Sequence, residues 1–362
     1  MQIMIISTVP YEPNGITAVI RSLYANGLFS KDRLVFVVPA GSDEACCREL
    51  TRWGHTVLFA RNRNRNPLGY MTFLKKAMKE NKVELVHIHG NSGTCVTELA
   101  AAVWAGVPHR VLHAHSSTCN SIALHRVLQP MLNRLTTVGL ACSREAGAFM
   151  FGRREIQVLA NGIPVEEFVF HPDLRRQYRE RYGLSNQVVL GHVGTFSQLK
   201  NQGFLVDVLA QWRRRGVDAV LVLVGDGPLR ESVAQKAMDL GVGEQVIFTG
   251  ACNGTQEILN LFDYFLFPSL SEGFGIAPVE AQANGLPVIA AQGRMPEAVR
   301  IHDNFRFVPL EAGAAGWCDV LDTMSPERCP DGADLVRRRG FDRMDAVTQM
   351  RQMFLNMMQI EE

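Results

Sequence analysis

Short apolar runs alternate with helix-length amphipathic stretches from one end of the chain to the other. This alternation is typical of βαβ units and predicts parallel sheets. Some runs, such as Val-Leu-Val-Leu-Val at 220–224, are apolar throughout, as expected of strands covered on both faces. The predicted strands are 3–7, 34–38, 56–59, 85–88, 110–113 and 139–142 in the first half, and 188–193, 219–224, 246–249, 264–267, 287–290 and 306–308 in the second.

The two sets of strands predict two domains of similar size. The chain has 362 residues, which is long for one domain and suits two of about 150–180 residues each. A strongly charged stretch at 171–180 separates the two sets, and Pro172 interrupts whatever precedes it. We therefore expect one α/β domain with a parallel sheet at 1–170 and another at 180–340. Apolar residues recur every three or four positions between 342 and 360, which predicts a terminal amphipathic helix in 341–362.

Composition narrows the class of protein. Hydrophobic residues make up 47% and charged residues 20%, as in globular proteins, and the formal net charge of +1 argues against a nucleic-acid partner. The eight cysteines include no C-x-x-C pair and suit a reducing compartment. The first residues lack a basic segment, and no apolar run approaches the roughly 18 residues of a spanning helix. We expect a cytoplasmic protein, at most peripheral at the cytoplasmic membrane.

The segment 268–281 carries the clearest chemical signal, because it follows a predicted strand and opens a predicted helix. Gly273 and Gly275 would expose backbone amides at the helix amino terminus, where the dipole favours phosphate. Glu272 and Glu280 would lie roughly 12 Å apart along a helix, too far for a glycosidase pair at about 5 Å. They could instead grip two hydroxyl-bearing ends of one ligand. A capped helix with two surface glutamates is equally compatible with these residues.

Two further turns between strand and helix are candidates for phosphate binding. Lys200 follows a strand near a helix start, a suitable place for a cation on a diphosphate, although most lysines are simply exposed. Gly15 lies between the first strand and the first helix, where a glycine lets the backbone approach a ligand. A lone glycine is a weak signal, and from the residues alone a simple strand-to-helix turn is the favoured interpretation of Gly15.

Two His-x-His pairs, His87 with His89 and His113 with His115, end predicted strands. Alternate strand residues share a face, so each pair could ligate a metal, but no third ligand follows at a useful spacing. We therefore predict no metal site. The crevice beyond the carboxyl ends of strands holds ligands in open α/β sheets, so these histidines are placed near a ligand.

A basic, asparagine-laced loop contains Arg61, Arg63 and Arg65. Such charge runs are usually solvated loops. Alternatively, the loop lies at an acceptor site and attracts a phosphorylated lipid carrier or an anionic membrane surface.

The segment 272–280 resembles the signature of retaining glycosyltransferase family 4, of the GT-B class. Its two glutamates are separated by seven residues, with Gly-Phe-Gly after the first. The similarity continues in 283–290, 224–229, 248–250, 161–163 and 86–90, in the family's order along nearly the whole chain. The resemblance implies two Rossmann-like domains facing each other across a cleft, the first binding the acceptor and the second the nucleotide-sugar donor. It also implies a terminal helix that packs back on the first domain.

The family's pattern assigns roles to the residues of the 272–280 segment. Glu280 would bind the ribose hydroxyls of the donor. Glu272 would hold the 3- or 4-hydroxyl of the donor sugar, with the amides of Gly273, Phe274 and Gly275 beside the sugar and the diphosphate.

Outside that segment, the resemblance implies that Lys200 contacts the diphosphate and that Gly15 approaches its distal phosphate. His115 would face the transferred sugar. Thr195 stands where the family usually has an arginine, so it supplies a neutral hydrogen bond in place of a charge.

The implied reaction moves a hexose or N-acetylhexosamine from a UDP-sugar to the hydroxyl of a sugar or lipid-linked saccharide, with retention, in surface polysaccharide or glycolipid synthesis. The catalytic residues would be His115, Lys200 and Glu272. We expect no cofactor and, since no Asp-x-Asp motif is present, no obligatory metal. Two alternatives remain open: a GT-B nucleotide-sugar epimerase, and a donor-binding pseudoenzyme or scaffold suggested by Thr195.

Overall fold

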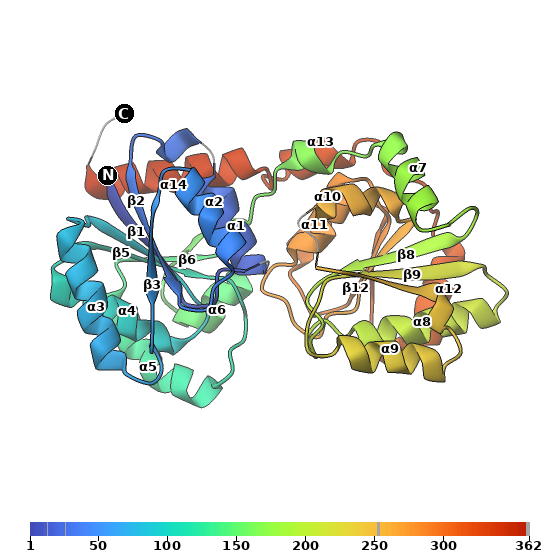
Figure 1. Cartoon of the computed structure of the whole chain (residues 1–362), viewed down its shortest axis with the longest axis horizontal. Coiled ribbons are helices and arrows are strands. Elements are labelled where there is room, and N and C mark those ends of the chain that lie inside the picture. The colour runs from blue at the N-terminus through green and yellow to red at the C-terminus, as the bar shows by residue number, and fades with distance from the viewer. Residues whose placement is uncertain (13, 26, 252–253, 360–362) are drawn as a thin grey trace. The chain divides into compact units, whose positions relative to one another are not determined.

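The computed structural model describes residues 1–12, 14–25, 27–251 and 254–359. Cys252 and the last three positions of the expected terminal helix region, 360–362, lie outside the described residues. The chain divides into unit 1, Met1–Gly162 with Arg343–Glu362, and unit 2, Ile163–Asp342. Each unit is built around one parallel sheet (Figure 1).

The sheet of unit 1 has the strand order β3-β2-β1-β4-β5-β6-β7, which is doubly wound about β1. Its strands are β1 Gln2–Ser7, β2 Arg33–Pro39, β3 Thr56–Ala60, β4 Leu85–His89, β5 His109–Ala114, β6 Val138–Ala141 and β7 Gln157–Val158. The first six were predicted within two residues at each end. The two-residue edge strand β7 was not, because its exposed side chains leave no hydrophobic pattern.

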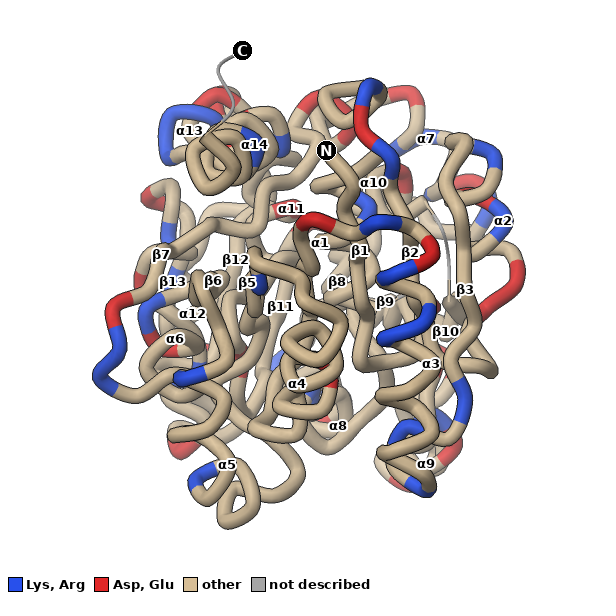
Figure 2. The backbone as a smooth tube through the Cα atoms, turned by 90° about the vertical axis from the view of Figure 1, so that its left-hand side faces the viewer, with Lys and Arg blue, Asp and Glu red and all other residues tan. Residues whose placement is uncertain are grey.

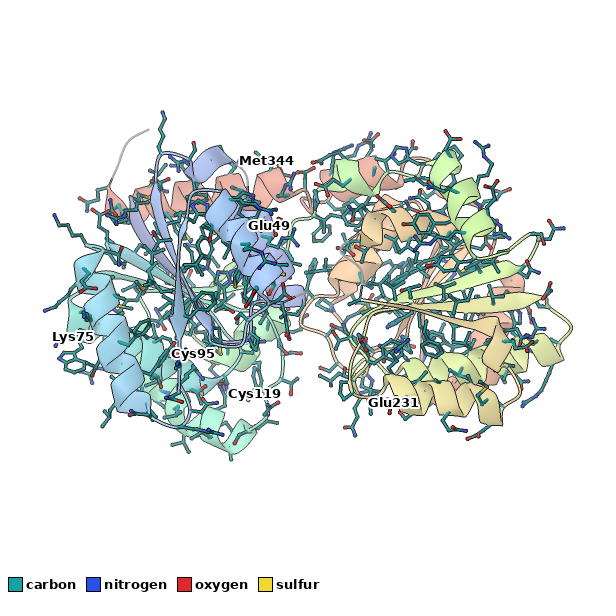
Figure 3. The ribbon with its side chains drawn as sticks, viewed as in Figure 1. Glu49, Lys75, Cys95, Cys119, Glu231 and Met344 are labelled. Carbon is teal, nitrogen blue, oxygen red and sulfur yellow. The ribbon has the colours of Figure 1, made fainter. Side chains whose placement is uncertain are left out.

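The helices of unit 1 cover both faces of this sheet (Figure 1). They are α1 Gly15–Tyr24, α2 Glu44–Arg52, α3 Pro67–Glu80, α4 Val96–Ala105, α5 Ile122–Leu135, α6 Arg144–Phe151 and α14 Arg343–Met358, with short 3₁₀ turns η1 Gly27–Phe29 and η2 Gly93–Cys95. Helix α3 packs against α4, where the ammonium of Lys75 lies 3.7 Å from the ring centroid of Trp104 (Figure 3). On the other face α14 contacts α1, and Arg351 donates to Asp32 at 2.7 Å.

The sheet of unit 2 has the order β10-β9-β8-β11-β12-β13. Its strands are β8 Val188–Val193, β9 Ala219–Val224, β10 Val246–Gly250, β11 Tyr264–Phe267, β12 Val288–Ala291 and β13 Phe305–Val308. Strands β8, β9 and β11 match the predicted strands residue for residue, and the expected α/β fold class is confirmed for both sheets. Large buried side chains such as Phe196, Trp212 and Trp317 fill the core beside β8 and β9.

The helices of unit 2 include the charged stretch that was expected to separate the domains. They are α7 Pro172–Arg181, α8 Gln202–Arg214, α9 Arg230–Asp239, α10 Thr255–Ile258, α11 Ile276–Ala283, α12 Gly313–Thr323 and α13 Gly332–Arg338, with 3₁₀ turns η3 Val165–Phe168, η4 Gly243–Gln245, η5 Leu259–Leu261, η6 Glu297–Val299 and η7 Leu310–Ala312. Arg175 of α7 pairs with Asp263 at 2.5 Å and donates to the carbonyls of 260–262. The charges of α7 therefore attach it to unit 2 and do not mark a solvated linker.

Basic and acidic residues are interspersed along the helices and loops (Figure 2). This distribution fits the near-zero net charge of the chain. Among the described residues, none of the helices has both the length and the apolar character needed to cross a bilayer.

Two glycines hold the loop after β9 directly against the loop after β8. Gly225 has φ +134° and Gly227 has φ +152°. A Cβ on Gly225 would lie 2.2 Å from the carbonyl oxygen of Gly194, and one on Gly227 would lie 2.5 Å from the carbonyl oxygen of Phe196. Only glycine fits a backbone conformation and an approach of this kind. The conformation of the 194–200 loop therefore depends on the 225–227 loop.

We expect Gly225→Ala to destabilise unit 2 more than Gly216→Ala. Gly216 also has a positive φ, +94°, but no atom of the described residues lies within 4 Å of where its Cβ would be. Both variants strain the backbone by about 1–2 kcal/mol, and Gly225→Ala adds a steric clash of about 1–3 kcal/mol. Urea unfolding of the two variants measures the difference. Equal losses would show that the two loops are not in the close contact described.

Candidate functional site

In unit 2, the carboxyl ends of β8 and β11 bring together two residues that are 72 positions apart. Lys200 Nζ donates to Glu272 Oε1 at 2.6 Å, and both side chains are mostly buried. The ammonium also lies 4.8 Å from the ring centroid of Phe267, the last residue of β11. Thr195, in the same loop as Lys200, is exposed. The structure therefore places a cation and a carboxylate at one point of the sheet edge.

The turn after Glu272 presents buried backbone amides at the start of α11. Gly275 is the N-cap residue with φ +93°, and the ring of Phe274 is buried against Phe341 at 5.3 Å between centroids. The amides of Gly273, Phe274 and Gly275 have no acceptor among the described residues. Buried amides are nearly always hydrogen-bonded, so this turn can accept an anion at a helix amino terminus.

Glu280 lies one turn further into α11 and is half-buried. Burial raises the pKa of its carboxyl to about 7. A carboxylate in this environment favours a ligand that donates hydrogen bonds to it, because such bonds stabilise the charged form.

His192 of β8 was not among the predicted site residues. Its Nδ1 lies 2.8 Å from the carbonyl oxygen of Leu266, while its buried Nε2 has no partner among the described residues. Burial lowers its pKa to about 4, with a smaller contribution from the charge of Lys200. A single polar residue inside an otherwise apolar strand is the sequence signal that identifies it.

In unit 1, the carboxyl ends of β4 and β5 bring the four histidines of the two His-x-His pairs together. The strand register pairs His89 with His113. His115 Nε2 lies 2.9 Å from His89 Nδ1, and the amide of His115 donates to Asn91 Oδ1 at 2.9 Å. Burial lowers the pKa of His115 to about 3, so its ring is neutral near pH 7.

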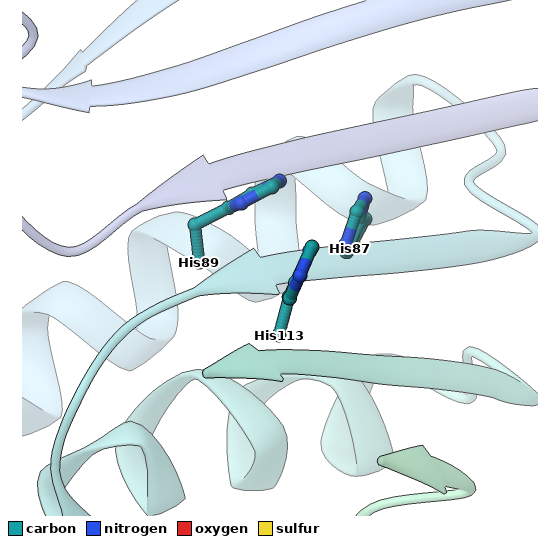
Figure 4. Close-up of side chains that lie close together, drawn as sticks. All are labelled: His87, His89 and His113. Atoms are coloured by element: carbon teal, nitrogen blue, oxygen red, sulfur yellow. The ribbon is translucent and has the colours of Figure 1, made fainter. Parts of the chain in front are cut away.

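The third ligand that neither His-x-His pair has in sequence comes from the neighbouring strand. His87, His89 and His113 each offer a ring nitrogen within 4.8 Å of those of the other two (Figure 4). The expectation of no metal ligand set followed from spacing along one strand. It did not include the register between strands.

The other predicted residues of unit 1 follow β1 and β3 at the same edge of the sheet. Gly15 is the first residue of α1 and is exposed, while Asn14 caps the helix by accepting from the amide of Thr17 at 3.0 Å. Arg61 and Arg65 are exposed.

Arg63 has a different environment from the other two arginines of its loop. It forms a bidentate contact with the fully buried carboxylate of Glu98, at 2.6 and 3.0 Å. Its guanidinium is thus committed to an internal ion pair, and an acceptor-binding role for Arg63 stays a prediction.

Comparisons with known proteins agree with these observations. Residues 187–325 match the family model described as Glycosyl transferases group 1. EpsF of Bacillus subtilis, named as a glycosyltransferase, is 34% identical over 237 residues, 62% of each chain. A protein of Escherichia coli named UDP-Gal:alpha-D-GlcNAc-diphosphoundecaprenol alpha-1,3-galactosyltransferase is 28% identical over 60% of each chain. The match thus spans less than two thirds of these relatives.

The solved structures that resemble this chain cover nearly all of it. HepE of Anabaena, in complex with UDP-glucose, has a TM-score of 0.82 with 20% identity, covering 98% of this chain and 99% of that one. The lipopolysaccharide outer core galactosyltransferase WaaB has a TM-score of 0.70 with 17% identity, over 98% and 99% of the two chains. Residues 187–325 thus match the group 1 glycosyltransferase family, and the chain as a whole shares the GT-B fold of these solved structures.

Proposed function

We propose that this chain is a retaining glycosyltransferase that moves a hexose or N-acetylhexosamine from a UDP-sugar to an acceptor hydroxyl in surface polysaccharide or glycolipid synthesis. The contact of Lys200 with Glu272 carries this proposal, together with the adjacent amides of the α11 turn, which have no acceptor in the described part of the chain. A UDP-glucose complex of HepE and a relative named for UDP-Gal and a diphosphoundecaprenol acceptor support it. In this proposal unit 2 binds the donor and unit 1 binds the acceptor.

The donor diphosphate would bind between the ammonium of Lys200 and the amides of Gly273, Phe274 and Gly275. Its charge competes with Glu272 for Lys200, which is 2.6 Å from that carboxylate. A diphosphate that draws Lys200 toward itself leaves Glu272 Oε1 able to accept from the 3- or 4-hydroxyl of the sugar. Binding of the phosphates and of the sugar would thereby be linked through one ion pair.

The departing diphosphate would be neutralised by this chain's own groups. The sequence contains no Asp-x-Asp motif, so Lys200 and the α11 amides take the place of a divalent ion in this proposal. Preorganised donors aimed at developing charge are usually the largest contribution to catalysis. The diphosphate itself would take the proton of the acceptor hydroxyl, and His115 would donate to the transferred sugar through a neutral ring.

The acceptor side of the proposal rests on the exposed arginines of the 61–65 loop. Arg61 and Arg65 present their charges to solvent. A lipid-linked acceptor carries phosphate at an anionic membrane surface, which attracts basic residues by about 1 kcal/mol each.

A nucleotide-release panel tests the reaction. The full chain is incubated with UDP-glucose, UDP-galactose, UDP-N-acetylglucosamine and GDP-mannose, and free nucleotide is measured. Release of UDP supports the proposal, while release of GDP alone would overturn the assigned base. Conversion of a UDP-sugar to its epimer without an acceptor would identify the epimerase alternative. Tight UDP-sugar binding without turnover against any acceptor would favour the pseudoenzyme.

We expect Glu280→Ala to weaken UDP binding by about 1.5–3 kcal/mol, because the carboxylate would accept hydrogen bonds from the ribose hydroxyls. Isothermal titration calorimetry measures the loss. The matched control is Glu231→Ala, an exposed acidic residue in the first turn of α9 (Figure 3). Unchanged UDP affinity in Glu280→Ala would show that Glu280 does not bind the ribose hydroxyls.

The raised pKa of Glu280 gives the same role a pH signature. In the free protein the carboxyl is protonated below about pH 7, whereas ribose hydroxyls favour its ionised form. UDP-glucose, whose diphosphate does not titrate in this range, should therefore bind about tenfold more tightly at pH 8 than at pH 6. Glu280→Gln should abolish this dependence.

Thr195→Arg should preserve or raise turnover. Thr195 is exposed in the loop that carries Lys200, so a longer side chain fits, and a guanidinium binds a diphosphate bidentately. Gln198→Arg, an exposed position of the same loop, controls for added charge. Loss of folding or of donor binding in Thr195→Arg would mean that position 195 is packed and that another residue supplies the positive charge to the donor diphosphate.

His115→Ala should lower kcat by about 10²-fold or more while UDP affinity stays nearly unchanged. A group that acts on the transferred sugar contributes to the transition state more than to nucleotide binding. His109→Ala, at the opposite end of β5, is the matched control. A near-normal kcat would show that His115 has only a structural role. Equal losses of UDP affinity and turnover would show that His115 contacts the nucleotide and not the transferred sugar.

A further inference from the structure

Three histidine rings of unit 1 form a compact buried cluster on one face of the sheet (Figure 4). The ring centroids of His87 and His89, on β4, lie 4.1 Å apart. His113 of β5 lies 5.4 Å from His87 and 5.3 Å from His89. None of the three side chains is exposed to solvent.

The nitrogens inside this cluster lack hydrogen-bond partners. Within the part of the chain that the structure describes, His87 Nε2, His89 Nε2 and both ring nitrogens of His113 are buried without a partner. Most buried polar atoms are hydrogen-bonded, so each exception requires an explanation. A neutral imidazole has one lone pair, so these three adjacent rings can offer three lone pairs to a common ligand.

The outward nitrogens of two of these rings do have partners. His87 Nδ1 lies 2.6 Å from Tyr24 Oη, and His89 Nδ1 lies 2.9 Å from His115 Nε2. Metal-ligating histidines commonly donate the second ring N–H to a nearby acceptor, which fixes the tautomer and orients the ring. If Nδ1–H donates to Tyr24 and to His115, the lone pairs of His87 and His89 remain on Nε2.

We propose that His87, His89 and His113 bind one divalent transition-metal ion, of which Zn²⁺ is the representative. One ring nitrogen from each residue lies within 4.8 Å of those of the other two. Zn–N bonds of about 2.0–2.1 Å in tetrahedral geometry require nitrogens about 3.3 Å apart. Each pair of nitrogens must therefore approach by at most about 1.5 Å, which is within the reach of a rotation of the rings about their χ angles. Imidazole nitrogen is a preferred ligand of Zn²⁺, Cu²⁺ and Ni²⁺.

This site is independent of the proposed glycosyl transfer, because it needs neither donor nor acceptor. It has one structural link to the proposed site residue His115. A metal on His89 Nε2 fixes the proton on His89 Nδ1, and that N–H donates to His115 Nε2. The ion would thus hold the ring of His115 in one orientation from within the sheet.

Metal binding by the tag-free full chain tests the proposal. The chain is stripped with a chelator, and ZnCl₂ is titrated in competition with a chromophoric chelator. CoCl₂ is used in parallel, because its visible spectrum distinguishes four-coordinate from six-coordinate sites. We expect one Zn²⁺ per chain with submicromolar affinity, and the intense absorption of four-coordinate Co²⁺.

Three variants locate the ion. His87→Asn and His113→Asn should each weaken Zn²⁺ binding by about 100-fold or more. His302→Asn is the matched control, because His302 is also buried with both ring nitrogens unpartnered among the described residues, but it lies in unit 2 outside the cluster. Its Zn²⁺ affinity should equal that of the unmodified chain.

If the Asn variants do not fold, the proposal can still be tested by replacing one of the three histidines with another metal-binding residue. Thiolate is also a Zn²⁺ ligand, so His113→Cys should retain the metal and add a thiolate-to-cobalt charge-transfer band. Binding with only the weak spectrum of six-coordinate Co²⁺ would overturn the proposal. It would also be overturned if the chain bound no Zn²⁺, if His87→Asn and His113→Asn bound it as tightly as the unmodified chain, or if His113→Cys lacked the charge-transfer band.

Discussion

Parallel pairing is the constraint on which the chemistry of both units depends. Every pairing between strands of the two sheets in the described residues is parallel, so each loop that follows a strand leaves at the same edge of its sheet. That edge carries Lys200 and Glu272 in unit 2, and Gly15 and His115 in unit 1. Residues far apart in sequence become neighbours there without any element having to bend or cross another.

The groups at these edges are held in environments that oppose their usual ionisation. Burial raises the pKa of Glu280 to about 7 and lowers that of His192 to about 4. In unit 1, burial and neighbouring rings keep His89 and His113 neutral, with pKa values well below the usual range. Shifted pKa values of this kind are most frequent at binding and catalytic sites, where a protein sacrifices stability for function. The amides of the α11 turn, for which the described residues offer no acceptor, belong to the same pattern.

The sequence predicted the architecture better than the site. Apolar runs located β8, β9 and β11 to the residue, because both faces of these strands are buried. The role of α7 was not predictable, since its charged side chains are typical of a linker until Asp263, 88 residues away, is placed beside Arg175. The ion pair between Arg63 and Glu98 likewise depends on tertiary contacts. The position of His113 beside His87 and His89 depends on the register between β4 and β5. Lys200 and Glu272 were assigned to one donor site by the family resemblance, because nothing in the chemistry of the two residues alone links them.

The connectivity of the chain makes unit 2 an insertion within unit 1. The chain enters unit 2 at Ile163 and leaves it at Asp342, and these two residues form a β-bridge beside the hydrogen bond from the Ile163 amide to the Phe341 carbonyl, at 2.9 Å. Unit 2 therefore has adjacent ends and a continuous sequence, so it can fold on the ribosome as soon as it has emerged. Unit 1 is complete only once α14, which follows unit 2 in the chain, has been synthesised. Before α14 is made, the part of unit 1 that its buried residues Val347, Met350 and Phe354 pack against lacks those contacts.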